Sequence, residues 1–170
     1  LRAMLEFAME YGGPLAIRYP RGTAYRGLKE FSQPIVYGKG EMLYEESGIA
    51  LLAVGSMVST GEHVRDKLKA EGYACSLANG RFVKPFDREL VDRLASNHRL
   101  IVTMEENVLQ GGYGLGVTAY VHAHYPQVKV LNIALPDAYV EHGNVSLLRE
   151  ALKIDSDSII RTMKEGGWIG

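Results

Sequence analysis

Short apolar runs alternate with amphipathic stretches through most of this chain. Continuous apolar runs are typical of parallel strands, because both faces of such strands are buried under helices. The stretches between the runs repeat their apolar residues with the period of a helix and are long enough for right-handed crossovers. The pattern predicts an α/β fold with three layers, α/β/α, around a mostly parallel five-stranded sheet. The predicted strands are 49–54, 73–78, 100–104 and 128–133 with an edge strand at 34–39, and the predicted helices are 58–71, 88–96, 114–124, 146–152 and 156–164.

The beginning of the chain does not continue this alternation. Residues 1–11 are amphipathic and predict a helix, which Gly12-Gly13-Pro14 stops. Residues 15–19 predict a short strand that ends at Pro20. The chain opens at Leu1 within the helical pattern and without a capping residue, which suggests a segment of a longer protein.

A change of composition predicts a domain boundary. Residues 23–33 have no period and mix small, polar and charged side chains, which is typical of a linker. We therefore expect two parts, with 1–30 as the tail of one domain and its linker, and 31–170 as a second domain.

The charge balance argues against several classes of partner. Lys and Arg number 19 and Asp and Glu number 20, which leaves a formal net charge of −1. No general field favours a polyanion, so we expect neither nucleic acid nor a membrane as partner. No apolar run approaches the roughly 20 residues of a membrane helix. The single cysteine, Cys75, cannot form an internal disulfide, which fits a reducing, cytoplasmic location.

Two carboxylates and an amide, Glu105, Glu106 and Asn107, follow the predicted strand 100–104. In open α/β sheets, ligands and working residues collect beyond the carboxyl ends of the strands. Pairing of the two carboxylates could raise one pKa for acid or base chemistry. The other interpretation is helix capping or an interface, since no nucleophile, histidine or metal ligand is near in sequence.

Two loops at predicted helix starts each have two interpretations, which are anion binding and a purely structural role. Ser56 or Ser59 lies where a serine caps free N–H groups or an anion binds them. Residues 110–116 hold four glycines, a density similar to that of a dinucleotide-binding loop. No acidic residue follows at the expected place, and close packing of the helix start is the other interpretation.

The histidines show no spacing that is typical of a zinc site. His122 and His124 fall on different faces of a helix. We therefore predict no metal ligand in this chain. His142 follows the last predicted strand in an irregular, charged segment and is a candidate loop or interface residue.

The segment Arg18-Tyr19-Pro20-Arg21-Gly22 holds two guanidinium groups in a short, stiff element. Proline fixes φ and glycine frees the next turn. The planar fork of arginine matches phosphate oxygens two at a time. The segment therefore indicates a phosphate-binding element, with surface salt bridges as the alternative.

Five motifs occur in order along the chain. They are Ile17-Arg18-Tyr19-Pro20-Arg21-Gly22, Tyr37-Gly38-Lys39-Gly40, Gly80-Arg81-Phe82-Val83-Lys84-Pro85-Phe86-Asp87, Thr103-Met104-Glu105-Glu106-Asn107 and Leu135-Pro136-Asp137. Each motif alone is modest, but the ordered set strongly resembles the 1-deoxy-D-xylulose-5-phosphate synthase family.

The resemblance implies an enzyme that uses thiamin diphosphate and Mg²⁺ to decarboxylate pyruvate and join the remaining two carbons to D-glyceraldehyde 3-phosphate. The product feeds isoprenoid precursors, thiamin and pyridoxal. The resemblance also implies a homodimer in which each full-length subunit has three α/β domains. In this chain, it implies that 1–30 are the tail of the pyrimidine-binding domain and that 31–170 are the transketolase-type carboxy-terminal domain. Arg21 matches the ligand of the aldehyde's phosphate, and Arg18 matches an arginine for which we carry over no role.

The chain has no Gly-Asp-Gly followed at some distance by Asn, which holds Mg²⁺ and the diphosphate in this family. We therefore expect no catalytic residue, bound cofactor or metal in this chain alone, and no activity without the other domains against which it packs. One alternative is the last domain of a transketolase or of a 2-oxo acid dehydrogenase β subunit. A non-catalytic module that binds an anion at 111–116 is the other.

Overall fold

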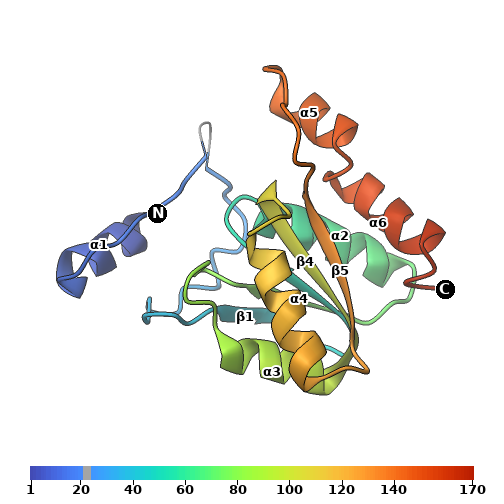
Figure 1. Ribbon diagram of the computed structural model, residues 1–170, viewed down its shortest axis with the longest axis horizontal. Coiled ribbons are helices and arrows are strands. Elements are labelled where there is room, and N and C mark those ends of the chain that lie inside the picture. Colours follow the sequence, from blue (N-terminus) through green and yellow to red (C-terminus); the bar gives the residue numbers. More distant parts are fainter. Residues whose placement is uncertain (21–23) are drawn as a thin grey trace.

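A five-stranded sheet forms the centre of the molecule, a computed structural model in which residues 1–20 and 24–170 are described (Figure 1). Its strands are β1 (Glu41–Tyr44), β2 (Gly48–Ala53), β3 (Cys75–Asn79), β4 (His98–Val108) and β5 (Lys129–Leu135). Their order across the sheet is β1-β3-β2-β4-β5. All neighbouring pairs are parallel except that of β1 with β3. The predicted mostly parallel, five-stranded sheet is confirmed.

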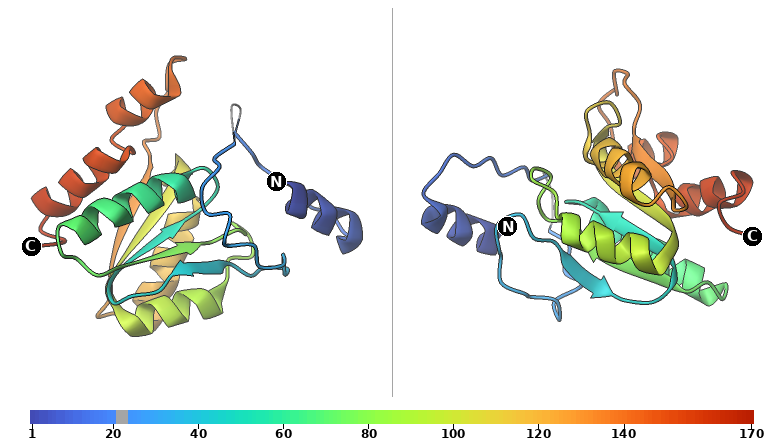
Figure 2. Two further views of the ribbon diagram at one scale, coloured as in Figure 1. Left: turned by 180° about the vertical axis from the view of Figure 1, so that it is seen from behind. Right: turned by 60° about the horizontal axis from the view of Figure 1, so that its bottom comes forward.

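Helices cover both faces of this sheet. α2 (Met57–Ala70) and α6 (Ser156–Glu165) pack on one face, and α3 (Arg88–Asn97) and α4 (Tyr113–His124) pack on the other. The view from behind in Figure 2 shows α2 and α6 on the near side of the sheet and α4 on the far side. The predicted three layers are therefore present. Two helices, α1 (Arg2–Tyr11) and α5 (Val145–Ala151), lie outside these layers and contain no buried residue.

Alternation along the strands builds a separate core on each face. In β2, Ile49 and Leu51 belong to the core under α2 and α6, whereas Ala50 and Leu52 belong to the core under α3 and α4. Successive side chains of a strand point to opposite faces, which produces this division. All four residues are at most 1% exposed. Burial of each large apolar side chain contributes about 1.5–3 kcal/mol, so both faces stabilise the sheet.

Side-chain caps fix where several helices begin. Asp87 accepts a hydrogen bond from the N–H of Leu90 at the start of α3, at 3.2 Å. Asp155 accepts one from the N–H of Ser158 at the start of α6, at 3.1 Å. Such caps stabilise a helix by about 0.5–2 kcal/mol. The five helices predicted after residue 57 all begin within one residue of the observed start.

The predicted strand at 15–19 is wrong, because these described residues form no strand. An extended run becomes a strand only where a sheet edge accepts its backbone hydrogen bonds. Here the contact with the sheet is made by a side chain, that of Arg18, and not by the backbone ladder.

The predicted edge strand at 34–39 is also misplaced, since the edge strand is β1. Gly38 has φ 67°, and the N–H of Lys39 donates to the carbonyl oxygen of Val36 at 3.0 Å. The chain therefore turns within the predicted range and pairs with β3 only from Glu41 onward.

A buried ion pair attaches the segment before β1 to the loop after β3. Arg81 pairs with Glu41, and their side chains are 9% and 5% exposed. Arg81 also donates to the carbonyl oxygens of Gln33 and Pro34, at 3.1 and 3.2 Å. Glu41 accepts from the N–H of Gln33 at 3.0 Å. The end of the predicted linker is thus fixed by one arginine and one glutamate.

α1 lies beside the β1 end of the sheet and away from the three layers (Figure 1). The ring of Tyr11 stacks on Tyr37 with centroids 5.0 Å apart. Leu5 and Met9 are nevertheless 49% and 81% exposed. The division into 1–30 and 31–170 stays a prediction. Within the described residues, no helix combines the length and the apolar character needed to cross a membrane.

Candidate functional site

The carboxyl ends of β2, β3, β4 and β5 lie along one edge of the sheet, because these strands are parallel. β4 extends beyond its neighbour, since the last residue of β2, Ala53, pairs with Met104 and β4 continues to Val108. The end of β4 therefore projects past β2 at this edge. The predicted site residues Glu105, Glu106 and Asn107 all lie in this projecting end.

Glu106 collects contacts from three other parts of the chain. Arg149 of α5 donates from Nε to its Oε1 at 3.1 Å. Ser56, between β2 and α2, donates from its hydroxyl to Oε2. Arg18 of the N-terminal segment donates from Nη2 to the backbone carbonyl oxygen of Glu106 at 3.0 Å. We call these four residues, Arg18, Ser56, Glu106 and Arg149, the Glu106 cluster.

The charges around Glu106 keep it ionised. The side chains of Glu106 and Arg149 are 30% and 23% exposed, so their pair is partly shielded from water. Burial alone would raise the pKa of Glu106, but hydrogen bonds from Arg149 and Ser56 and the charges of Arg149 and Arg18 outweigh it and lower the pKa. Of the two interpretations offered for the carboxylates, a pKa raised by their pairing does not apply to Glu106. The arrangement fits a carboxylate that holds its neighbours in place.

Glu105 is directed into the opposite layer and is 3% exposed. Its Oε2 accepts from the N–H of Tyr113 at 3.0 Å, and its Oε1 accepts from the N–H of Gly114 at 2.7 Å. A carboxylate at this position also complements the positive end of the helix dipole. Glu105 therefore caps α4, which is one of the two roles expected for it.

Glycines allow this close contact between α4 and β4. A Cβ atom on Gly112 would lie 2.7 Å from Oε1 of Glu105, and one on Gly114 would lie 2.5 Å from Oγ1 of Thr103. The glycine-rich run at the start of α4 thus serves close packing. Two N–H groups that an anion would need at this helix start are already bound by Glu105.

Asn107 and His142, the other predicted residues that the structure describes, do not join the Glu106 cluster. Arg21 lies outside the described residues. Asn107 is half-buried at the end of β4, and His142 is exposed in the segment between β5 and α5.

Sequence reasoning misread Ser56 and missed Arg149. Ser56 occupies the N-cap position of α2, but its side chain makes no capping hydrogen bond and instead donates to Glu106. The capping interpretation is therefore wrong for Ser56, because its hydroxyl donates to a carboxylate on β4 that lies far away in the sequence. Arg149 carries no local motif and is separated from Glu106 by 43 positions. Its contact with Glu106 depends on where the segment after β5 places α5, which the sequence pattern does not show.

The described residues do not fit a site for thiamin diphosphate and Mg²⁺. Magnesium requires carboxylate or other oxygen ligands that are free to coordinate it. Glu105 is buried against the start of α4, and the charge of Glu106 is balanced by Arg149, so neither offers an exposed, uncompensated carboxylate to the ion. In the described ranges, no three His, Cys, Asp or Glu side chains gather to hold a metal ion. We therefore assign no step of cofactor chemistry to these residues.

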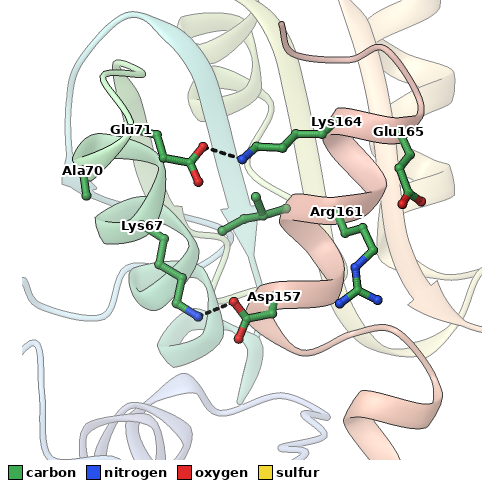
Figure 3. A pocket seen from close by; sticks show the side chains of 8 residues that line it. Lys67, Ala70, Glu71, Asp157, Arg161, Lys164 and Glu165 are labelled. Carbon is green, nitrogen blue, oxygen red and sulfur yellow. Dashed lines mark hydrogen bonds and ion pairs between the residues drawn. The ribbon is translucent and has the colours of Figure 1, made fainter.

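A groove of about 690 Å³ lies between α2 and α6 (Figure 3). Ion pairs cross it, from Lys67 to Asp157 and from Lys164 to Glu71, each at 2.6 Å. The lining residues of α2 belong to its last turn. Because α2 starts at the carboxyl edge of the sheet and runs back toward the amino edge, this groove is separate from the candidate site.

The family model described as transketolase, C-terminal domain, matches residues 38–159. The 1-deoxy-D-xylulose-5-phosphate synthase of Lachnoclostridium phytofermentans is 47% identical over 158 residues, which are 92% of this chain and 25% of that protein. That of Heliobacterium modesticaldum is 40% identical over 97% of this chain and 26% of that protein. The chain thus spans about a quarter of the length of these curated relatives.

Solved structures show the same fold. A structure described as "Split gene transketolase, inactive beta4 tetramer" matches with a TM-score of 0.82 and 25% identity, over 96% of this chain and 53% of that one. Transketolase from Campylobacter jejuni matches with a TM-score of 0.51 and 18% identity, over 75% of this chain and 18% of that one. The second likeness concerns the fold alone.

Proposed function

Because the chain belongs to the family of transketolase C-terminal domains, we propose that it forms the carboxy-terminal part of a 1-deoxy-D-xylulose-5-phosphate synthase. The observation that carries the proposal is the 47% identity to one such synthase over 92% of the chain. The identity to the split-gene transketolase is 25%, which favours the synthase over a transketolase. Occupation of the α4 start by Glu105 argues against the alternative of a free anion-binding module.

The full-length protein would condense pyruvate with D-glyceraldehyde 3-phosphate and release CO₂. Thiamin diphosphate supplies stabilisation of a carbanion in reactions of this kind. In our proposal, the cofactor and Mg²⁺ are held by parts of the polypeptide outside these 170 residues. The engaged carboxylates at the carboxyl edge support this division of labour. The proposed protein is a cytoplasmic homodimer that serves the synthesis of isoprenoid precursors, thiamin and pyridoxal.

Within that protein, the proposed role of this chain is to pack against the other domains and to supply Arg21 as the anchor for the aldehyde's phosphate. Support comes from Arg18, which precedes Arg21 by three positions and is held at the carboxyl edge of the sheet. This edge is where open α/β sheets place their ligands. Arginine suits the task, since its planar fork pairs with two phosphate oxygens.

The test is Arg21→Ala in the full-length protein, with Arg26→Ala as a matched control from an exposed position of the same segment. Loss of a charge-assisted phosphate contact, worth about 1.5–3 kcal/mol, corresponds to a KM for D-glyceraldehyde 3-phosphate raised roughly 10- to 150-fold. The KM for pyruvate is expected to change little in either variant. An aldehyde KM that is the same in Arg21→Ala and Arg26→Ala would refute the anchoring role.

The 170-residue chain alone is expected to show no turnover of pyruvate with D-glyceraldehyde 3-phosphate. The measurement is release of CO₂ in the presence of added thiamin diphosphate and Mg²⁺. Turnover by this chain would contradict the proposal that the cofactor is held elsewhere.

A further inference from the structure

The end of β4 leaves the regular ladder where the Glu106 cluster forms. Along β4 the paired positions advance from Met104 to Val108, whereas along β5 they advance only from Ile133 to Leu135. β4 therefore carries two extra residues in a bulge, beyond the last pair with β2 at Met104. Bulges of this kind redirect side chains and free backbone groups near functional sites. The carbonyl oxygen of Glu106 is thus placed to accept a donor from outside the sheet.

The bulge is held from two sides through the Glu106 carboxylate. Arg149 binds one oxygen and Ser56 binds the other, and these residues lie 43 and 50 positions away in sequence. The bulged residues between the paired positions Met104 and Val108 lie outside the regular register and would otherwise be freer to change their peptide orientation. The carboxylate contacts fix that orientation, and with it the direction of the carbonyl oxygen that accepts from Arg18.

We propose that Glu106 is a positioning residue of the synthase: clamped by Arg149 and Ser56, it fixes the end of β4 so that its carbonyl oxygen holds Arg18 and thereby positions the segment that carries Arg21. The inference rests on the proposed function for the phosphate anchor. It adds to that function a residue that acts through Arg18 and not on the substrate itself.

An alternative role for Glu106 in proton transfer does not fit the contacts. Both carboxylate oxygens accept hydrogen bonds, and one guanidinium lies at 3.1 Å. Arg149 and Arg18 both favour the ionised form. A carboxylate held in this way binds a proton poorly, whereas it is well suited to hold two chain segments together.

The variant that tests the proposal is Glu106→Gln in the full-length protein, which keeps the shape and removes the charge. Glu46→Gln is the matched control, because Glu46 forms a similar part-buried pair with Arg65, at 2.8 Å, but at the amino edge of the sheet. Ser56→Ala removes one clamp with less disturbance and serves if Glu106→Gln folds poorly. The expected effect is a rise of roughly three- to tenfold in the KM for D-glyceraldehyde 3-phosphate, because a small displacement of a binding group weakens its contact. The kcat and the KM for pyruvate are expected to remain nearly unchanged.

A double variant separates positioning from a general structural effect. If Glu106 acts through the Arg21 segment, Glu106→Gln raises the aldehyde KM in the wild-type background but adds nothing in Arg21→Ala. A structural defect would instead raise the KM by the same factor in both backgrounds. Tryptic cleavage of the bond after Arg18 gives a readout without activity, and it is expected to be faster in Glu106→Gln than in wild type and Glu46→Gln, because the Arg18 side chain is held less firmly.

The outcomes distinguish this inference from the proposed function. If the wild-type protein makes no 1-deoxy-D-xylulose 5-phosphate, the proposed function fails, and tryptic cleavage after Arg18 still decides whether Glu106 holds the segment. If wild type and Arg21→Ala behave as proposed but Glu106→Gln matches Glu46→Gln in aldehyde KM and in tryptic cleavage after Arg18, the positioning role alone is overturned. Equal effects of Glu106→Gln in both backgrounds would overturn it as well.

Discussion

Removal of Arg81 is expected to be among the most destabilising single changes in the chain. Arg81 and Glu41 are 9% and 5% exposed, and Arg81 also donates to the backbone carbonyl oxygens of Gln33 and Pro34. In Arg81→Met the Glu41 carboxylate stays buried and, among the described residues, keeps only the N–H of Gln33 as a partner. Breaking a buried pair from one side typically costs about 3–5 kcal/mol, because the remaining charge is uncompensated. That is a large part of a total stability of roughly 5–15 kcal/mol.

The assay is urea unfolding of the chain, with Arg93→Met as a control. Arg93 forms an ion pair with Glu45 in which the side chains are 51% and 46% exposed, and such surface pairs contribute about 0–1 kcal/mol. Replacing both partners, as in Arg81→Met with Glu41→Leu, is expected to restore most of the loss, since an apolar pair leaves no buried charge. If Arg81→Met lowers the free energy of unfolding no more than Arg93→Met, the argument from the buried charge is wrong.

Two further predictions concern the carboxyl edge. Gly114→Ala is expected to destabilise the chain by about 1–3 kcal/mol, because its Cβ would meet Oγ1 of Thr103 at 2.5 Å, whereas Gly116→Ala, whose Cβ would meet only a ring carbon at 4.0 Å, is expected to be neutral or stabilising in thermal unfolding. The lowered pKa of Glu106 stabilises the fold above the ordinary glutamate pKa of 4.5, and this contribution is lost as the pH falls through the lowered value. The difference in stability between wild type and Glu106→Gln should therefore shrink below about pH 4.5, and a difference that stays constant from neutral pH into acid would contradict the assigned shift.

The layers of this fold could be predicted because their signal is local. The apolar runs, their flanking glycines and the helical periods can each be read from a short stretch of sequence. The burial of these residues in the two cores follows from them. The strand expected at 15–19 failed because a local pattern does not tell whether a sheet edge is available as a partner. The edge strand was misplaced for a similar reason, since the turn at Gly38 comes from backbone conformation and not from hydrophobic period.

The contacts of the candidate site could not be predicted in the same way. Arg18 and Glu106 are 88 positions apart, and Arg81 and Glu41 are 40 apart. No periodic pattern relates residues at such distances, so motif resemblance was the only route to them. Even that route gave no role for Arg18, which the structure shows bound to the end of β4.

One part of the site did follow from strand geometry. Glu105 and Glu106 are adjacent on β4, so their side chains point to opposite faces of the sheet. Residues of β4 alternate between the two cores, with Met104 under α2 and α6 and Ile101 under α3 and α4. Glu105 accordingly meets α4, and Glu106 meets the start of α2 and α5. Two carboxylates that contact opposite faces of the sheet cannot share a proton as a catalytic pair does, so the interpretation of a carboxylate pair does not apply here. What adjacent carboxylates can do at a strand end is to fix the two layers on either side, and this is the arrangement from which the positioning role of Glu106 is inferred.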